Sequence, residues 1–371
     1  MIVFTSICMN YMPKAMVLGK SLRATNPDIK FYIVLLEKEI PSDLPEETYS
    51  YVEKIILAKD LGWKNFNDYI FKHSIVEAST SIKGKALIYM LENVDDEVIY
   101  IDPDIKIYNS LKEISKLFKY NSILLTPHLT IPEENKFDID NNELCALQHG
   151  VYNLGFLAVK KDPEGMDFAR WWNNRLKLYC YDDIPHGIFT DQRWIDLAPA
   201  YFDVKIIKNP GYNVAPWNLS KRELSIKNGK ILVNNQYELV FFHFSGFDSG
   251  ANETMLNYYV KNKDNIVYKL RDNYIQELED FGQEKFGRYT WSYGMYESGE
   301  LISQRVRLLY RDNDLSVKID TNPFLLSNEH LLHILCPKNI NITYISKWKR
   351  VLKLFIPFRI RRCIKILLGR E

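Results

Sequence analysis

The chain has 371 residues, 46% of them apolar, and its 48 basic and 47 acidic side chains give a net charge of +1. The apolar share excludes wholesale disorder, and the length suits one large domain or two. A near-neutral chain differs from a generally basic nucleic-acid-binding protein, so no nucleic-acid partner is expected. Five cysteines without a C-x-x-C pair argue against a disulfide framework or a cysteine-based zinc site, and they favour a reducing compartment.

Neither a secretion signal nor a membrane-spanning segment is indicated. Residues 1–6 lack a basic start followed by a long apolar run, and no stretch of about 18 apolar residues occurs. We therefore expect a cytoplasmic protein.

The first part of the chain alternates short apolar runs with helical patterns. Residues 2–8 and 31–36 are predicted strands, with a helix over 13–23 between them. A second helix over 83–92 leads to a further strand over 98–101. This alternation predicts an α/β fold with a mainly parallel sheet flanked by helices, in which ligands gather at the carboxyl ends of the strands.

Two carboxylates follow the strand predicted at 98–101. Asp102 and Asp104 are separated by Pro103, which fixes the turn and allows both side chains to face one site. Hard oxygen ligands at such a place suit Mg²⁺ or Mn²⁺, and such an ion binds a diphosphate. The two residues alone leave open a plain solvated acidic turn.

The acidic pair belongs to an ordered set of motifs. An opening stretch over 5–27, Tyr152-Asn-Leu-Gly-Phe156, Thr190-Asp-Gln-Arg193 and Phe242-His-Phe-Ser-Gly246 accompany it. In this order the set resembles the nucleotide-sugar-dependent glycosyltransferases of the GT-A fold, most closely the retaining family 8 enzymes and their bacterial relatives. The resemblance covers about residues 1–250. It implies a Rossmann-like, mainly parallel mixed sheet and the transfer of a sugar from a nucleotide donor, with a UDP-sugar favoured, to a hydroxyl acceptor with retention.

The resemblance implies a metal site made of Asp102, Asp104 and His243, holding Mn²⁺ or Mg²⁺. Two carboxylates and an imidazole leave coordination positions for phosphate oxygens, and the metal neutralises the departing nucleoside diphosphate. Read alone, His243 in its apolar run is more often a packed strand histidine. Gly246 suits a close approach of the backbone to a phosphate. The family pattern continues to a phosphate-binding lysine, whereas Phe247-Asp-Ser-Gly follows here.

Five further residues are expected near the sugar. By the resemblance, Gln192 presents its amide carbonyl to the developing positive charge, and Asp191 orients a hydroxyl. Asn153 and Gly155 line the donor sugar, and Trp217 stacks on a sugar face of donor or acceptor. Ordinary structural uses stay open for each: a helix cap at 190–191, a bend in a buried strand, and a plain loop.

The nucleotide itself is expected to contact two regions that precede the acidic pair in the sequence. The loop after the first strand offers Tyr11 for stacking, and the start of the helix at 83–92 offers cations for the phosphates. A plain loop and a solvated helix start are the alternatives. The predicted donor-nucleotide contacts are Thr5, Asn10, Tyr11, Lys83 and Lys85.

The pattern changes after residue 250. Residues 251–285 are predicted to be helical, and the role of the extension over 251–343 is open. Residues 344–371 form a basic amphipathic segment, with nine Lys or Arg and one acid over 347–371. Such a segment suggests a peripheral membrane anchor on the inner face of the cell membrane and hence a lipid-linked or surface-polysaccharide acceptor. A helix docked on the domain is the alternative.

Two rival functions stay open at this point. A nucleotidyltransferase also uses a carboxylate-bound metal, but it more often carries a glycine-rich opening loop, which residues 5–13 lack. A non-catalytic sugar-nucleotide or glycan-binding protein at the membrane surface is the rival from another class. Turnover of a sugar donor separates these possibilities.

Overall fold

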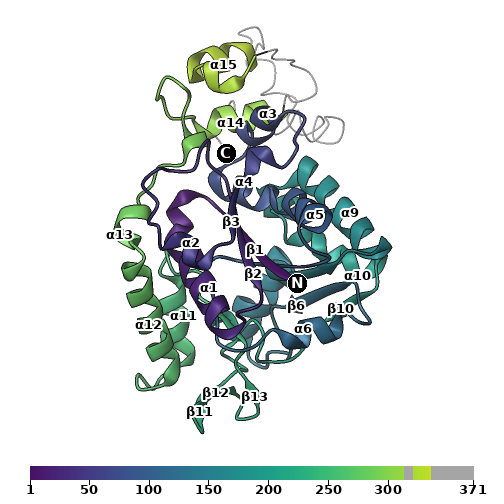
Figure 1. Cartoon of the computed structure of the whole chain (residues 1–371), viewed down its shortest axis with the longest axis vertical. Coiled ribbons are helices and arrows are strands. Elements are labelled where there is room, and N and C mark those ends of the chain that lie inside the picture. The colour runs from purple at the N-terminus through teal and green to yellow at the C-terminus, as the bar shows by residue number, and fades with distance from the viewer. Residues whose placement is uncertain (313–320, 336–371) are drawn as a thin grey trace, which may run out of the picture. The chain divides into compact units, whose positions relative to one another are not determined.

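The computed structural model describes residues 1–312 and 321–335, which form two compact units (Figure 1). The first unit consists of residues 1–62 and 79–290. The second contains residues 63–78 and the described residues from 291 onward. The basic segment predicted at 344–371 lies outside the described residues.

The first unit is built on a seven-stranded mixed sheet with the strand order β10-β6-β7-β4-β1-β2-β3. β1 runs parallel to β2 and β4, and the pairs β2–β3 and β10–β6 are also parallel. Only β7 opposes its neighbours β4 and β6. The carboxyl ends of β1, β2 and β4 therefore lie at the same edge of the sheet. The strands are β1 (Ile2–Ile7), β2 (Lys30–Leu35), β3 (Lys54–Leu57), β4 (Glu97–Ile101), β6 (Ile123–Pro127), β7 (Tyr152–Lys160) and β10 (Val204–Ile206).

Both faces of this sheet are covered by helices, which explains why all six residues of β1 are buried. Val3 and Ile7 belong to the same apolar cluster as Met16 of α1. Because side chains alternate along a strand, Phe4 points to the opposite face, where its ring centroid lies 5.2 Å from that of Tyr100. Figure 1 shows α5 and α9 together on one side of the sheet and α1 beside α12 on the other.

The helices of the first unit begin and end where the sequence provides the signals. Pro13 lies in the first turn of α1, and the helix ends at Thr25, just before Asn26 and Pro27. Asp162 caps α9 by accepting a hydrogen bond from the Gly165 amide. The helices are α1 (Met12–Thr25), α2 (Thr48–Tyr51), α5 (Lys83–Asn93), α6 (Lys112–Leu117), α7 (Lys136–Asp138), α8 (Leu144–His149), α9 (Pro163–Tyr179), α10 (Ala198–Tyr201), α11 (Ala251–Tyr259), α12 (Ile266–Asp280) and α13 (Gln283–Phe286).

Three smaller sheets complete the unit. In the pair β5–β14, His243 lies opposite Ile105, so this pair connects the acidic turn after β4 with the histidine motif. The other two are the three-stranded sheet β11–β12–β13 and the short pair β8–β9. Their bounds are β5 (Ile105–Ile107), β8 (Asp182–Asp183), β9 (Ile188–Phe189), β11 (Leu224–Lys227), β12 (Lys230–Val233), β13 (Tyr237–Glu238) and β14 (Phe241–His243).

The second unit joins a short segment from the first part of the chain to its later residues. It contains α3 (Phe66–Phe71), the start of α4 (Ile75–Ser81), α14 (Gln304–Asp312) and α15 (Asn328–Leu335). The Arg307 guanidinium donates hydrogen bonds to the backbone carbonyls of Phe71, His73 and Tyr293. Arg311 forms a buried ion pair with Glu77 at 2.6 Å. These contacts explain why residues 63–78 fold with the later segment.

The predicted α/β class is confirmed, with a mainly parallel mixed sheet flanked by helices and a helical region toward the C-terminus. The predicted strands and helices in the first hundred residues occur within one or two positions of their expected ends. The division into 1–250, 251–343 and 344–371 stays a prediction, since its last segment lies outside the described residues. Within residues 1–312 and 321–335, no disulfide forms and no helix has the length and apolarity to cross a membrane.

Candidate metal and donor site

The structure brings Asp102, Asp104 and His243 together beyond the end of β4. The Asp102 amide donates to the Gly155 carbonyl at 2.9 Å, and the chain then turns so that the Ile105 amide reaches the Asp102 carbonyl at 3.2 Å. His243 Nε2 lies 3.1 Å from Asp104 Oδ1 and 4.0 Å from Asp102 Oδ2. One ligand atom from each residue lies within 4.8 Å of the others. His243 is a buried residue on a strand, as the packed-strand alternative has it, and its side chain also faces both carboxylates.

The second nitrogen of His243 has a partner that suits a metal ligand. Nδ1 lies 3.3 Å from Asn213 Oδ1, and an amide oxygen can only accept, so Nδ1 carries a proton and Nε2 is the nitrogen that faces the carboxylates. Asn213 is held by its own bond to Asn153 Oδ1 at 3.0 Å. The Trp217 ring packs edge-on against the imidazole with centroids 5.3 Å apart. Two carboxylates and one oriented imidazole fit a divalent ion such as Mn²⁺ or Mg²⁺.

Without a metal, His243 and Asp104 favour each other's charged form. Burial acts to lower the pKa of His243, but the carboxylates of Asp104 and Asp102 raise it above its ordinary value. Burial likewise acts to raise the pKa of Asp104, and His243 overcomes this effect and lowers it. A proton on His243 would offset one of the two carboxylate charges. A divalent ion would displace that proton.

Gly155 leaves the space that His243 occupies. A Cβ at this position would lie 2.6 Å from His243 Cε1 and 2.7 Å from Asn153 Oδ1, distances that real Cβ atoms do not tolerate. The predicted place of Gly155 beside the sugar stays a prediction. Its observed contribution is to let the imidazole approach β7.

A Gly155→Ala variant is therefore expected to lose most of its affinity for Mn²⁺, by about tenfold or more, because the added methyl group displaces the imidazole. Titration with Mn²⁺ followed by electron paramagnetic resonance measures this loss. Gly294→Ala is the matched control, since a Cβ there meets Trp291 only at ordinary contact distances of 3.8 and 3.9 Å. Equal Mn²⁺ affinity in Gly155→Ala and the wild type would contradict the assignment of His243.

Lys83 connects the metal site with the Asp191–Gln192 segment. Its Nζ lies 3.1 Å from Asp102 Oδ1 and 3.0 Å from Asp191 Oδ2, and the side chain is 5% exposed. Burial alone would lower the pKa of Lys83, but Asp102, Asp191 and Tyr100 raise it well above its ordinary value. The lysine therefore stays charged and holds two carboxylates that come from distant parts of the chain. Its predicted phosphate contact stays a prediction.

Asp191 and Gln192 are both buried beside β7. Asp191 Oδ1 accepts a hydrogen bond from the Thr190 hydroxyl at 3.0 Å, and burial raises the pKa of Asp191. Gln192 Oε1 accepts from the Leu154 amide at 3.0 Å and from the Asn153 amide group at 3.4 Å. The Gln192 carbonyl is thus directed at the backbone of β7. For the predicted contact with the positive charge that develops on the sugar, the amide would have to turn, or its oxygen would have to contact β7 and the sugar at once.

The remaining nucleotide candidates differ in their surroundings. Thr5 in β1 and Asn10 in the turn after it each have a buried side-chain oxygen without a hydrogen-bond partner in the described structure. The Tyr11 hydroxyl donates to Asp248 Oδ2 at 2.9 Å. Lys85 Nζ lies 3.8 Å from where a Cβ at Gly62 would stand, and no described contact connects it to the metal site.

Gly246 lies in the loop at 245–250, which follows β14. Its φ of +72° is one that side chains rarely adopt, and its carbonyl accepts the Asn252 amide at 3.1 Å. A tight turn thus explains this glycine. Its predicted contact with a phosphate stays a prediction.

Sequence reasoning missed three residues of this region. The Tyr100 hydroxyl donates to Asp102 Oδ1 at 2.5 Å, and its position two residues earlier on the same strand face was a usable signal. Asn213 lies in the Gly- and Pro-containing segment around Trp217 and adopts a φ of +53°. Nothing in the local pattern marks Lys14, which is buried at the start of α1.

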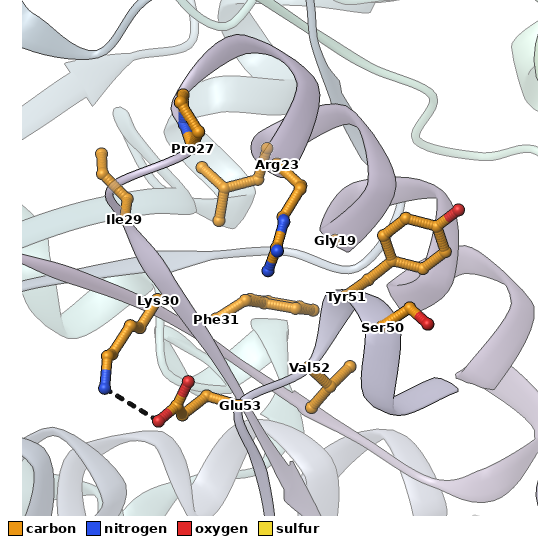
Figure 2. A pocket seen from close by; sticks show the side chains of 11 residues that line it. Gly19, Arg23, Pro27, Ile29, Lys30, Phe31, Ser50, Tyr51, Val52 and Glu53 are labelled. Atoms are coloured by element: carbon orange, nitrogen blue, oxygen red, sulfur yellow. Dashed lines mark hydrogen bonds and ion pairs between the residues drawn. The ribbon is translucent and has the colours of Figure 1, made fainter. Parts of the chain in front are cut away.

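A second hollow, of about 70 Å³, lies away from these residues (Figure 2). It is lined by the end of α1, the start of β2 and the residues before β3, among them Arg23, Lys30 and Glu53. These lie at the amino ends of the parallel strands. Since ligands of such sheets bind at the carboxyl ends, this hollow is not part of the candidate site.

Together, the fold and the site define an α/β protein with a candidate divalent-metal site at the carboxyl end of its central strands. No protein-family model matches the chain. It is 33% identical over 154 residues to the uncharacterized protein YfnF of Bacillus subtilis (strain 168). The matched stretch covers 41% of this chain and 50% of that protein. The chain is 22% identical over 281 residues to the uncharacterized protein YfnD of the same organism, covering 72% of this chain and 84% of that protein. The match to YfnF thus spans half of that relative.

Among solved structures, the chain is similar to glycosyltransferases at low identity. An active-site mutant of LgtC is 17% identical, with 66% of this chain and 88% of that chain covered and a TM-score of 0.40. The galactosyltransferase LgtC in complex with donor and acceptor sugar analogs is 18% identical, with 58% and 76% covered and a TM-score of 0.35. The glycosyltransferase GlyE of Streptococcus pneumoniae TIGR4 is 14% identical, with 80% and 66% covered and a TM-score of 0.39. All three TM-scores lie below 0.5.

Proposed function

We propose that this protein is a metal-dependent glycosyltransferase of the GT-A kind, which moves a sugar from a nucleotide diphosphate donor to a hydroxyl acceptor. The observation that carries the proposal is the convergence of Asp102, Asp104 and His243 at the carboxyl end of β4, with His243 oriented by Asn213. A metal held by these groups would neutralise the charge on the leaving nucleoside diphosphate. UDP-sugars are the favoured donors, and the sugar is expected to keep its anomeric configuration.

The surrounding residues support the proposal through their positions. Asn153 and Gly155 lie on β7 next to His243, and Asp191 and Gln192 are connected to the metal site through Lys83 and β7. Polar groups from separate segments thus meet at one strand end, where a donor sugar would lie beside its diphosphate. Asp191 is assigned to orient a hydroxyl.

The test is donor turnover by the full chain. Purified protein is incubated with UDP-sugars and GDP-sugars, with Mn²⁺ or with a chelator, and the release of nucleoside diphosphate is measured. Metal-dependent release of UDP or GDP supports the proposal, and nuclear magnetic resonance of the product reports the anomeric configuration. Saturable metal-dependent nucleotide binding without turnover would favour a binding protein. Release of pyrophosphate from a nucleoside triphosphate would favour a nucleotidyltransferase, although the turn over residues 8–12 contains no glycine.

The acceptor and the location are part of the same proposal. The charge of +8 over residues 347–371, from nine basic residues and one acid, supports a peripheral position on the inner face of the cell membrane and a lipid-linked or surface-polysaccharide acceptor. Removal of residues 344–371 is expected to abolish most of the sedimentation with vesicles that contain anionic lipid. Vesicles of neutral lipid serve as the control, and undiminished sedimentation of the shortened chain would contradict this part of the proposal.

A further inference from the structure

A buried lysine, Lys14, occupies a place that is costly for the fold. Lys14 is 2% exposed and lies in the first turn of α1, which begins at Met12. A lysine loses hydration when it is buried, and its positive charge opposes the helix dipole at this end of a helix. Both costs fall if an anion lies against the ammonium group.

In the structure, that anion is a carboxylate of a neighbouring loop. Lys14 Nζ contacts Asp248 Oδ2 and lies 3.9 Å above the ring of Tyr11, whose hydroxyl donates to the same carboxylate oxygen at 2.9 Å. One ammonium and one phenol thus hold a single anionic oxygen. Lys14 is buried, whereas the Asp248 side chain that lies against it is 50% exposed and faces solvent.

The pair lies beside the candidate metal site. Asp248 belongs to the loop at 245–250, directly after β14, and the Phe244 amide donates to the Asp104 carbonyl at 2.8 Å. Gly246 and Gly250, on either side of Asp248, have φ of +72° and +75°.

We propose that Lys14 and Tyr11 bind the diphosphate of the donor, and that Asp248 occupies their place as an internal carboxylate until the donor displaces it. This inference rests on the proposed function, because it assigns a phosphate contact to the same site. A diphosphate bound to a metal at Asp102 and Asp104 would carry further anionic oxygens, and an ammonium paired with a hydroxyl suits one of them. Displacement of Asp248 into solvent restores its hydration, so the exchange costs little.

The experiment measures nucleotide binding by calorimetry, with Mn²⁺, in the full chain. UDP is compared with uridine and GDP with guanosine, so that contacts to phosphate are separated from contacts to the nucleoside. Lys14→Met is expected to raise the Kd of the diphosphate by about tenfold or more and to leave the nucleoside unaffected. Asp248→Asn is expected to lower the Kd of the diphosphate by roughly threefold, because the competing carboxylate is lost. Lys20→Met, on the exposed side of the same helix, is the control.

Each outcome decides the inference. If the wild type binds neither UDP nor GDP, the proposed function fails and the inference fails with it. If the wild type binds a diphosphate and Lys14→Met binds it equally well, only the inference fails. If Lys14→Met weakens the binding of nucleoside and of diphosphate equally, Lys14 has only a structural role, and the inference is also overturned. If Lys14→Met does not fold, Asp248→Asn decides: tighter UDP or GDP binding supports the inference, and unchanged or weaker binding overturns it.

Discussion

An Asp104→Ala variant is expected to release nucleoside diphosphate from the donor at least about a thousandfold more slowly than the wild type. Asp104 contributes one of the three ligand atoms that converge after β4, and it also holds His243 at 3.1 Å. Its removal takes one negative charge from the metal site and releases the imidazole. Initial rates measured over a range of Mn²⁺ concentrations separate the two consequences, since weaker metal binding alone is overcome at high Mn²⁺.

The matched control for this substitution is Asp96→Ala, just before the other end of the same strand. Asp96 has a side chain that is 75% exposed, and its ion pair with Lys161 at 3.5 Å lies at the surface. Such pairs contribute little, so the control is expected to keep its rate within about twofold. Full activity in Asp104→Ala would reject the metal assignment, whatever the control does.

The parts of the fold that the sequence predicted are those set by local chemistry. β1, β2 and β4 are mostly apolar and buried, and the helices between them carry proline or helix-forming residues at the expected ends. The acidic turn after β4 is local too, because Pro103 and the strand end determine it. Hence the class of fold and the position of the carboxylates followed from residues that are neighbours in the chain.

The parts that could not be predicted depend on contacts between distant residues. Asn213 touches His243, thirty residues further along the chain, because its neighbour Val214 pairs with β14. Lys14 meets Asp248 across 234 residues, and no local pattern indicates which surface a helical lysine faces. Similarly, residues 63–78 fold with α14 because two buried arginines bind their backbone and Glu77.

Lys83 shows how a prediction from a local pattern was redirected by such a distant contact. As a cation at the start of α5, it was expected to face phosphates, but two carboxylates from other segments already surround it. Its first effect is therefore on the folded state and on the arrangement of the site. The predicted contact of Lys83 with phosphate concerns the protein with a bound donor.

A Lys83→Met variant is expected to lose about 3–5 kcal/mol of stability, since it leaves the carboxylate of Asp191 buried without a cation. Asp191 is only 3% exposed and cannot recover its hydration without local unfolding. Urea unfolding followed by tryptophan fluorescence measures the loss. Lys85→Met, two residues along the same helix, is the control and is expected to change stability by about 0.5 kcal/mol or less.

A second substitution separates loss of charge from loss of packing. In the double variant Lys83→Met with Asp191→Asn, the buried charge is gone, so a large part of the lost stability is expected to return. If Lys83 contributed only packing, Asp191→Asn would restore no stability, because an amide fills the same space as the carboxylate. The stability losses of the two single variants would then add. The double variant has a consequence for the site as well. With Asp191 neutral, Asp102 alone lacks its cation, so a return of stability without a return of Mn²⁺ affinity would show that Lys83 orients the metal-binding carboxylate in addition to stabilising the fold.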